Sequence, residues 1–152
     1  MLEQTLVKQR LMPSGHWDWH VGMPLSQGWR LGNFVFVGGQ LSMDEDGNVI
    51  GVGDIEAQTR NVFRNIGLVL KEAGGDWSDV IKLNTYYVFN GTGEQIREFW
   101  LKMTQVRLEF LPDPGPAATA VRVVGLMYDD LLIEADVIAY IERGNHKRES
   151  GT

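Results

Sequence analysis

Three stretches of the chain have strand character with apolar residues on both faces. They are NFVFV at residues 33–37, DVIKLNTYYVF at 79–89 and LLIEADVIAYI at 131–141. Successive side chains of a strand point to opposite faces of the sheet, so a sheet with one wet face alternates apolar with polar residues. In these stretches both alternating sets contain apolar residues. The sequence therefore predicts a sheet that must be covered on both faces.

Two helices are expected between the strands. Asp54 can cap a helix that begins at Ile55 and stops at Gly74-Gly75, with apolar residues at helical spacing. Thr92, followed by Gln95 three positions later, predicts a capping box for a second helix that ends before Pro112. As crossovers, both helices should pack on the same face of the sheet. The other face should meet a second subunit, which predicts an obligate homo-oligomer.

The remaining segments indicate more β structure. Residues 27–52 contain QGWRLG, NFVFVGG, an acidic turn at 44–48 and VIGVG, which are the pieces of hairpins. Two strands, 117–124 and 131–141, are expected to close the chain. The predicted fold class is α+β, in two layers with a mixed sheet. We divide the chain into an N-terminal strand and rim segment at 1–23, the main domain at 24–141 and a polar tail at 142–152.

Composition excludes several classes of function. The 152 residues include no cysteine, so disulfides, thiolate metal sites and cysteine nucleophiles are excluded. The net charge of −6, with dispersed lysines and arginines, argues against binding to nucleic acid or to an anionic membrane. The first ten residues lack a continuous apolar run, so neither a signal peptide nor a spanning helix is expected. A cytoplasmic protein is the default expectation.

The stretch HWDWH at residues 16–20 concentrates unusual side chains. On a strand, His16, Asp18 and His20 would share one face, and Trp17 and Trp19 would point the other way. Two imidazoles and a carboxylate could hold a cation, but no fourth ligand is indicated. The alternative is a solvated polar face with the tryptophans packed behind it.

Two acidic residues interrupt an apolar strand. Glu134 and Asp136 share one face of residues 131–141, beside apolar neighbours. A carboxyl group held against apolar side chains has its ionised form disfavoured, which raises its pKa and suits it to proton transfer. The alternative is structural: the two carboxylates could bond a backbone amide or Arg122 on the neighbouring strand.

Longer motifs resemble a known family. PLSQGWRLGNFVFVGGQLSMDEDGNV, GDIEAQTRNVFRNIGLVLKEAGGDWSDVIKLNTYYV, PGPAATAVRVVGL and LLIEADVIA resemble, in order and spacing, the YjgF/RidA family of reactive-intermediate deaminases. The resemblance runs from about Pro24 to Ile141. It implies a chorismate-mutase-like fold, a homotrimer and a small-molecule cleft at each subunit interface. It also implies that no cofactor and no metal are needed.

The same resemblance assigns the site residues. It gives the catalytic role, directing the water that attacks an imine carbon, to Glu134. The family arginine that grips the substrate carboxylate follows Pro-Ala, and here that position is Ala118. Leu25 stands in place of a tyrosine and Gly38 in place of a serine, and Met103 lies nearest to the position of an asparagine lent by the adjacent subunit. The expected ligand-binding set is Leu25, Gly38, Gly39, Gln40, Ala118, Thr119, Ala120 and Met103, with Trp17, Trp19 and His20 at the rim.

Three functions are compatible with these residues. The first is hydrolysis of an imine, enamine or related reactive metabolite, with poor activity on 2-aminoacrylate because alanine cannot hold its carboxylate. The second is a module that binds a small ligand without turnover. The third, from older labels in the family, is a ribonuclease or translation inhibitor. The acidic chain, without a basic stripe, makes the third the weakest.

Overall fold

The computed structural model describes residues 6–19 and 22–142. They form six strands and two α-helices, with one short 3₁₀ helix, Trp77–Asp79. The strands are β1 (Lys8–Leu11), β2 (Gly28–Leu31), β3 (Phe34–Leu41), β4 (Val80–Val88), β5 (Ala117–Val123) and β6 (Ile133–Tyr140), and the helices are α1 (Ile55–Glu72) and α2 (Glu94–Arg107).

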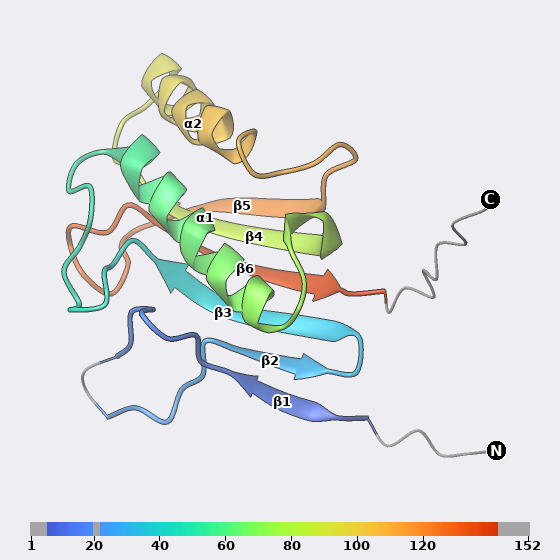
Figure 1. Cartoon of the computed structure of the whole chain (residues 1–152). Helices are drawn as coiled ribbons and strands as arrows, with labels where there is room; N and C mark the ends of the chain where they lie inside the picture. Colours follow the sequence, from blue (N-terminus) through green and yellow to red (C-terminus); the bar gives the residue numbers. More distant parts are fainter. Residues whose placement is uncertain (1–5, 20–21, 143–152) are drawn as a thin grey trace.

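The strands form one mixed sheet in the order β1-β2-β3-β6-β4-β5. Only the β4–β5 pair is parallel among the pairs in this sheet, and α2 is the crossover between these two strands. Figure 1 shows both helices on the same side of the sheet, with α1 across its centre and α2 near the β5 edge. The predicted two-layer α+β class is therefore confirmed.

Alternation along the central strands explains the two faces. The odd residues of β6, from Ile133 to Ala139, are buried under the helices together with Val35 and Val37 of β3. The even residues of β6 are only partly buried or exposed. On this open face Phe34 and Phe36 are 43% and 44% exposed, although both are large aromatic side chains. The side of the sheet away from the helices therefore leaves a row of apolar residues uncovered in the isolated chain.

The ends of α1 are as the sequence predicts. The Asp54 side chain accepts hydrogen bonds from the backbone amides of Glu56 and Ala57. Past the last turn, Gly74 adopts a positive φ of 85° and its amide bonds to Lys71 O. Glycine is favoured in this left-handed conformation because it has no Cβ.

Two local predictions are wrong. Residues 49–53 do not form a strand; Val49 makes only an isolated bridge to Met43, because Gly51 and Gly53 turn the chain with positive φ. The N-cap of α2 is Gly93 rather than Thr92, and glycine has no side chain that could cap the helix. Only the Gln95 half of the box is present, as a 3.4 Å bond from the Thr92 amide to Gln95 Oε1.

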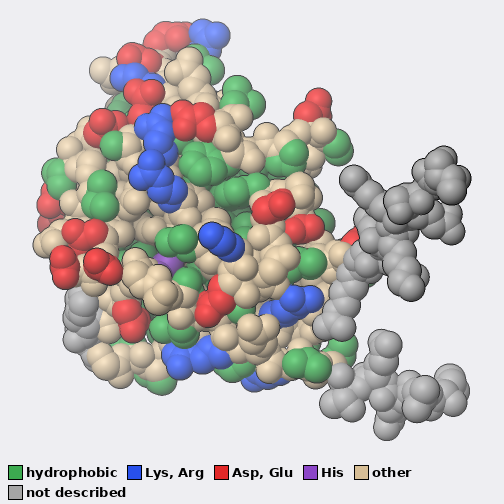
Figure 2. Space-filling model, viewed as in Figure 1, with side chains coloured by type: hydrophobic (Ala, Val, Ile, Leu, Met, Phe, Trp, Pro, Cys, Tyr) green, Lys and Arg blue, Asp and Glu red, His purple; other side chains and the backbone are tan. Residues whose placement is uncertain are grey.

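Charged side chains of both signs are interspersed on the helix side of the described chain (Figure 2). The ion pair between Arg60 of α1 and Glu109 joins the two helical segments across this surface. Neither α-helix in the described residues is long and apolar enough to span a membrane.

Candidate functional site

Glu134 lies on β6, where its carboxyl group has little space beside the neighbouring strand β3. Its register neighbours are Leu41 on β3 and Tyr86 on β4. Beside Leu41, the β3–β6 register shifts between Val37 and Gln40, which marks a bulge at Gly38–Gly39. A Cβ atom at Gly39 would collide with Glu134 Oε1 and lie 3.0 Å from Cδ. Only glycine therefore lets the carboxyl group lie against the strand.

The surroundings favour the protonated form of Glu134. Burial raises the pKa of its carboxyl group, and the negative charge of Asp136 raises it further. In the described part of the chain no side-chain hydrogen bond reaches Glu134, whereas Asp136 accepts one from Asn84 Nδ2 at 2.9 Å. A half-buried carboxyl with a raised pKa is suited to take and return a proton.

The structural alternative based on Arg122 is wrong. Strand β4 lies between β5 and β6, so Arg122 on β5 is not on a strand next to Glu134. Its guanidinium donates instead to the carbonyl oxygen of Gly91 at 3.1 Å. The sequence could not exclude this pair, because strand order depends on contacts between distant segments.

A second segment lies next to the bulge. The amide of Gly38 donates to Gln27 O at 2.8 Å, and a Cβ at Gly38 would be 3.4 Å from the carbonyl oxygens of Ser26 and Gln27. Arg10 of β1 holds the start of this segment through Leu25 O at 2.7 Å and Ser26 Oγ at 2.8 Å. The structure thus brings the segment from Leu25 to Gln27 beside Gly38, Gly39 and Gln40. Arg10 is a residue that the sequence did not single out.

The β5 residues lie elsewhere in the isolated chain. Thr119 is on the open face, where its hydroxyl accepts a 2.8 Å bond from Lys82 Nζ. Ala118 and Ala120 alternate with it and project to the helix side. Because β4 separates β5 from β6, the two strands are roughly 10 Å apart. One chain therefore does not bring Ala118, Thr119 or Ala120 against Glu134.

Residues 16–19, the described part of HWDWH, do not form a strand. His16 and Trp17 are both buried rather than alternating, and Asp18 is exposed and bonds the amide of Trp19. Trp17 is 2% exposed and joins a small core with Leu41, Met43 and Leu131, against which Trp19 packs. The strand predicted for these residues is therefore wrong, and Trp17 is buried on Leu41, the register neighbour of Glu134.

Other expected residues have different positions. His20 lies outside the described residues. Among the residues that are described, no group of three His, Asp or Glu side chains could hold a metal ion. Met103 is fully buried in the main core. Its side chain is therefore covered by its own chain and not open to a ligand.

One buried cation was missed by the sequence. Arg107, in the last turn of α2, is 9% exposed, and its Nε and Nη2 have no hydrogen-bond partner in the described residues. Its guanidinium lies 4.6 Å from the Trp100 ring, and burial lowers its pKa. The amphipathic pattern gave no signal for it, because an arginine near a helix end is usually solvated.

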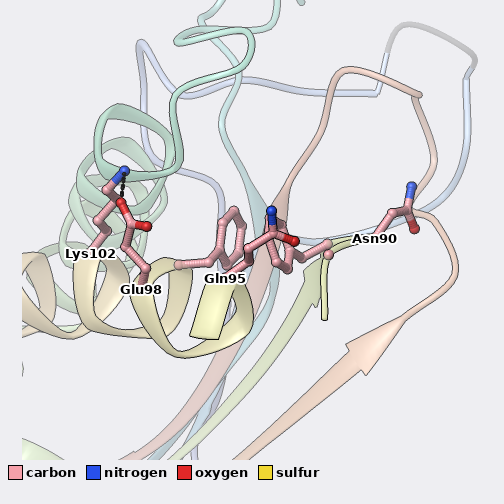
Figure 3. A pocket seen from close by; sticks show the side chains of 7 residues that line it. Asn90, Gln95, Glu98 and Lys102 are labelled. Atoms are coloured by element: carbon pink, nitrogen blue, oxygen red, sulfur yellow. Dashed lines mark ion pairs between the residues drawn. The ribbon is translucent and has the colours of Figure 1, made fainter. Parts of the chain in front are cut away.

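Three cavities lined by described residues do not include Glu134. One of about 400 Å³ opens at the start of α2, lined by Phe89, Asn90, Gly91, Gln95, Glu98, Phe99 and Lys102. Figure 3 shows Asn90 and Gln95 at this cavity and the ion pair between Glu98 and Lys102, whose Nζ and Oε1 are 3.2 Å apart. Glu134 lies instead on the open sheet face, among the partly buried residues of β6.

Comparison with known proteins gives the context for this geometry. Residues 20–141 match the family model described as endoribonuclease L-PSP. A RutC family protein of Pyrococcus abyssi is 40% identical over 119 residues, which cover 78% of this chain and 87% of the relative. The 3-aminoacrylate deaminase RutC of Acinetobacter baylyi is 37% identical over 109 residues, which cover 72% of this chain and 80% of that protein.

A solved structure is similar as well. The crystal structure of RidA from the Antarctic bacterium Psychrobacter sp. has a TM-score of 0.74 with 27% identity. The match covers 88% of this chain and 99% of the RidA chain. The arrangement of helices and sheet described above is therefore shared over nearly the whole of that protein.

Proposed function

Because this chain belongs to the YjgF/RidA family, whose model is described as endoribonuclease L-PSP, we propose that it hydrolyses a small imine or enamine at Glu134. The observation that carries the proposal is the carboxyl group of Glu134, half-buried against the Gly39 backbone with a raised pKa. The carboxylate would take a proton from water as the water attacks the imine carbon. Returning that proton to the nitrogen would give a carbinolamine, with a hydroxyl and an amino group on the same carbon. The hydroxyl proton would then pass through the same carboxyl group to the nitrogen as the C–N bond breaks, so that a carbonyl forms and ammonia leaves.

We propose that the cleft is formed by two copies of the chain in a homotrimer. The uncovered apolar row on the open face supports this assembly, because such patches in small domains usually mark interfaces. The separation of β5 from Glu134 also supports it, since the expected ligand residues Ala118, Thr119 and Ala120 could approach Glu134 only from another copy. Polarising amides near Gly39 and Ala120 would then face one ligand.

An assembly variant tests the trimer. Phe36 pairs with Trp29 and Ile138 on the open face, so Phe36→Glu would place a charge in the proposed interface. Burying an unpaired charge costs several kcal/mol. In light scattering we expect the wild-type protein to have three times the chain mass of 17.1 kDa. The variant should have a mass close to that of a single chain. Leu108→Glu, at a residue 72% exposed past α2, should leave the mass unchanged. A folded wild-type monomer at micromolar concentration would refute the assembly.

The expected substrate differs from the usual substrate of the family. Alanine at position 118 offers no cation to a carboxylate, and Lys82 lies four residues from Tyr86 along β4, roughly 13 Å away. We therefore expect slow release of ammonia from 2-aminoacrylate and 2-iminobutanoate, made in situ by a coupled deaminating enzyme. The panel of test substrates should also include 3-aminoacrylate, the substrate named for the Acinetobacter relative. Rapid hydrolysis of 2-aminoacrylate would overturn this expected selectivity.

The second candidate is a binding module without turnover. The loss of a cationic residue at Ala118 favours it, because the cleft would keep its shape without the group that fixes a charged substrate. In that case no member of the panel releases ammonia, and ligand affinity does not depend on the Glu134 carboxyl.

A further inference from the structure

The bulge beside Glu134 is fixed by two glutamines. A β-bulge leaves its extra residue without partners in the ladder. Here the Gly38 amide donates to Gln27 O at 2.8 Å, and Gly38 O accepts from Gln40 Nε2 at 3.1 Å. Gln27 and Gln40 therefore satisfy both backbone groups of Gly38.

The two glutamines also bond to each other and to the N-terminal segment. Gln40 Nε2 donates to Gln27 Oε1 at 3.0 Å, and Gln27 Nε2 donates to Trp17 O at 2.9 Å. The same carbonyl accepts from His16 Nδ1 at 2.8 Å. All four side chains are at most 9% exposed, so water competes little for these bonds.

We propose that Gln40 is a positioning residue for Glu134: it fixes the Gly38–Gly39 bulge against the Glu134 carboxyl and is itself anchored by His16 and Trp17 through Gln27. The proposal rests on the proposed function of Glu134. It gives His16 and Trp17 a role other than a metal site, since the Trp17 carbonyl oxygen holds the Gln27 side chain and His16 holds that carbonyl.

The physical reason is the tight fit at Gly39. Glu134 has little room beside Gly39, so a small movement of the bulge changes the space and the water around the carboxyl. Gln40 pairs with the core residue Ala135, next to Glu134, so its side chain controls this part of β3 without touching the carboxyl. The ionisable groups beside Glu134 are Asp136 on its own strand and Tyr86 on β4, and the hydrogen bonds of Gln40 go instead to Gln27 and Gly38.

The test is Gln40→Met, which keeps the length of the side chain and removes its hydrogen bonds. A ¹³C NMR titration of the Glu134 carboxyl, assigned by its absence in Glu134→Gln, needs no substrate. If the bulge is released, water can enter beside Glu134 and stabilise its ionised carboxylate. The acid dissociation constant of Glu134 should then be roughly three- to tenfold larger than in wild type. With any substrate that is turned over, kcat should fall roughly tenfold or more with little change in KM.

Ile66→Val, a truncation in the core of α1, is the control for a general loss of stability and should change neither readout. A folded Gln40→Met variant with the wild-type titration of Glu134 would overturn the positioning role, even if turnover is found. A shifted titration without turnover of any imine would instead leave the positioning role in place and refute the proposed function. If Gln40→Met does not fold, the same titration of Glu134 in Gln27→Met tests the positioning role by the same criterion. Failure of both to fold would refute the proposal, since the network would then serve folding alone.

Discussion

Replacing Glu134 by glutamine should lower kcat roughly 10²- to 10⁴-fold on whichever imine or enamine the wild-type protein hydrolyses. Glutamine keeps the shape that fits beside Gly39 but cannot accept a proton from water. Ligand affinity should change much less than turnover, because the walls of the cleft remain. The measurement is ammonia release together with calorimetric binding of an unreactive substrate analogue.

Asp136→Asn is the matched control for this prediction. Asp136 lies two residues along β6 and is bonded by Asn84, so its loss should leave most of the turnover. It should also lower the pKa of Glu134, because a nearby negative charge is removed. Turnover by Glu134→Gln at the wild-type rate would exclude the proposed catalytic role.

The raised pKa of Glu134 also determines the sign of a stability effect. The folded state holds the proton more tightly than the unfolded state, whose carboxyl has its ordinary pKa near 4.5. Wild-type stability should therefore fall as the pH rises from that value through the higher folded pKa. Glu134→Gln should lack this fall, so its stability relative to wild type increases over the same window. Thermal denaturation at a series of pH values measures the difference.

Replacing Gly39 by alanine should have the second large effect. The three atoms nearest to the added Cβ all belong to Glu134, so the carboxyl group must move. A displacement of about 1 Å can cost roughly 100-fold in turnover. Overpacking of this kind typically destabilises a protein by about 1–3 kcal/mol. Activity assays and chemical denaturation measure the two effects.

A double-mutant cycle isolates the cause. In a Glu134→Ala background the added methyl group meets none of those three atoms, so Gly39→Ala should cost little stability there. Gly125→Ala is the control, because a Cβ at Gly125 has open space around it. An equal loss of stability in both backgrounds would show that Gly39 is needed for the strand and not for Glu134.

Local chemistry made much of the fold predictable. The Asp54 cap, the apolar stripe of α1 and its glycine stop depend on residues close in sequence, and the structure has all three. The alternation of β6 likewise predicted that Glu134 and Asp136 share a face. Prediction failed where a local signal competed with tertiary contacts: Trp17 is buried on Leu41, so residues 16–19 are not the strand that their alternation indicates.

By itself, the sequence determined the α+β class, the two-sided apolar strands and the shared face of Glu134 and Asp136, because periodicity encodes these features locally. The family resemblance then pointed to Glu134 as the acid to examine. Only the tertiary structure decided what surrounds that acid. The strand order put Tyr86 beside it and Arg122 two strands away, and the bulge set Gly39 against its carboxyl. The tertiary structure also joined His16 and Trp17 to Gln27 and Gln40. These contacts link segments far apart in the chain, and their register depends on packing that no short pattern of residues records.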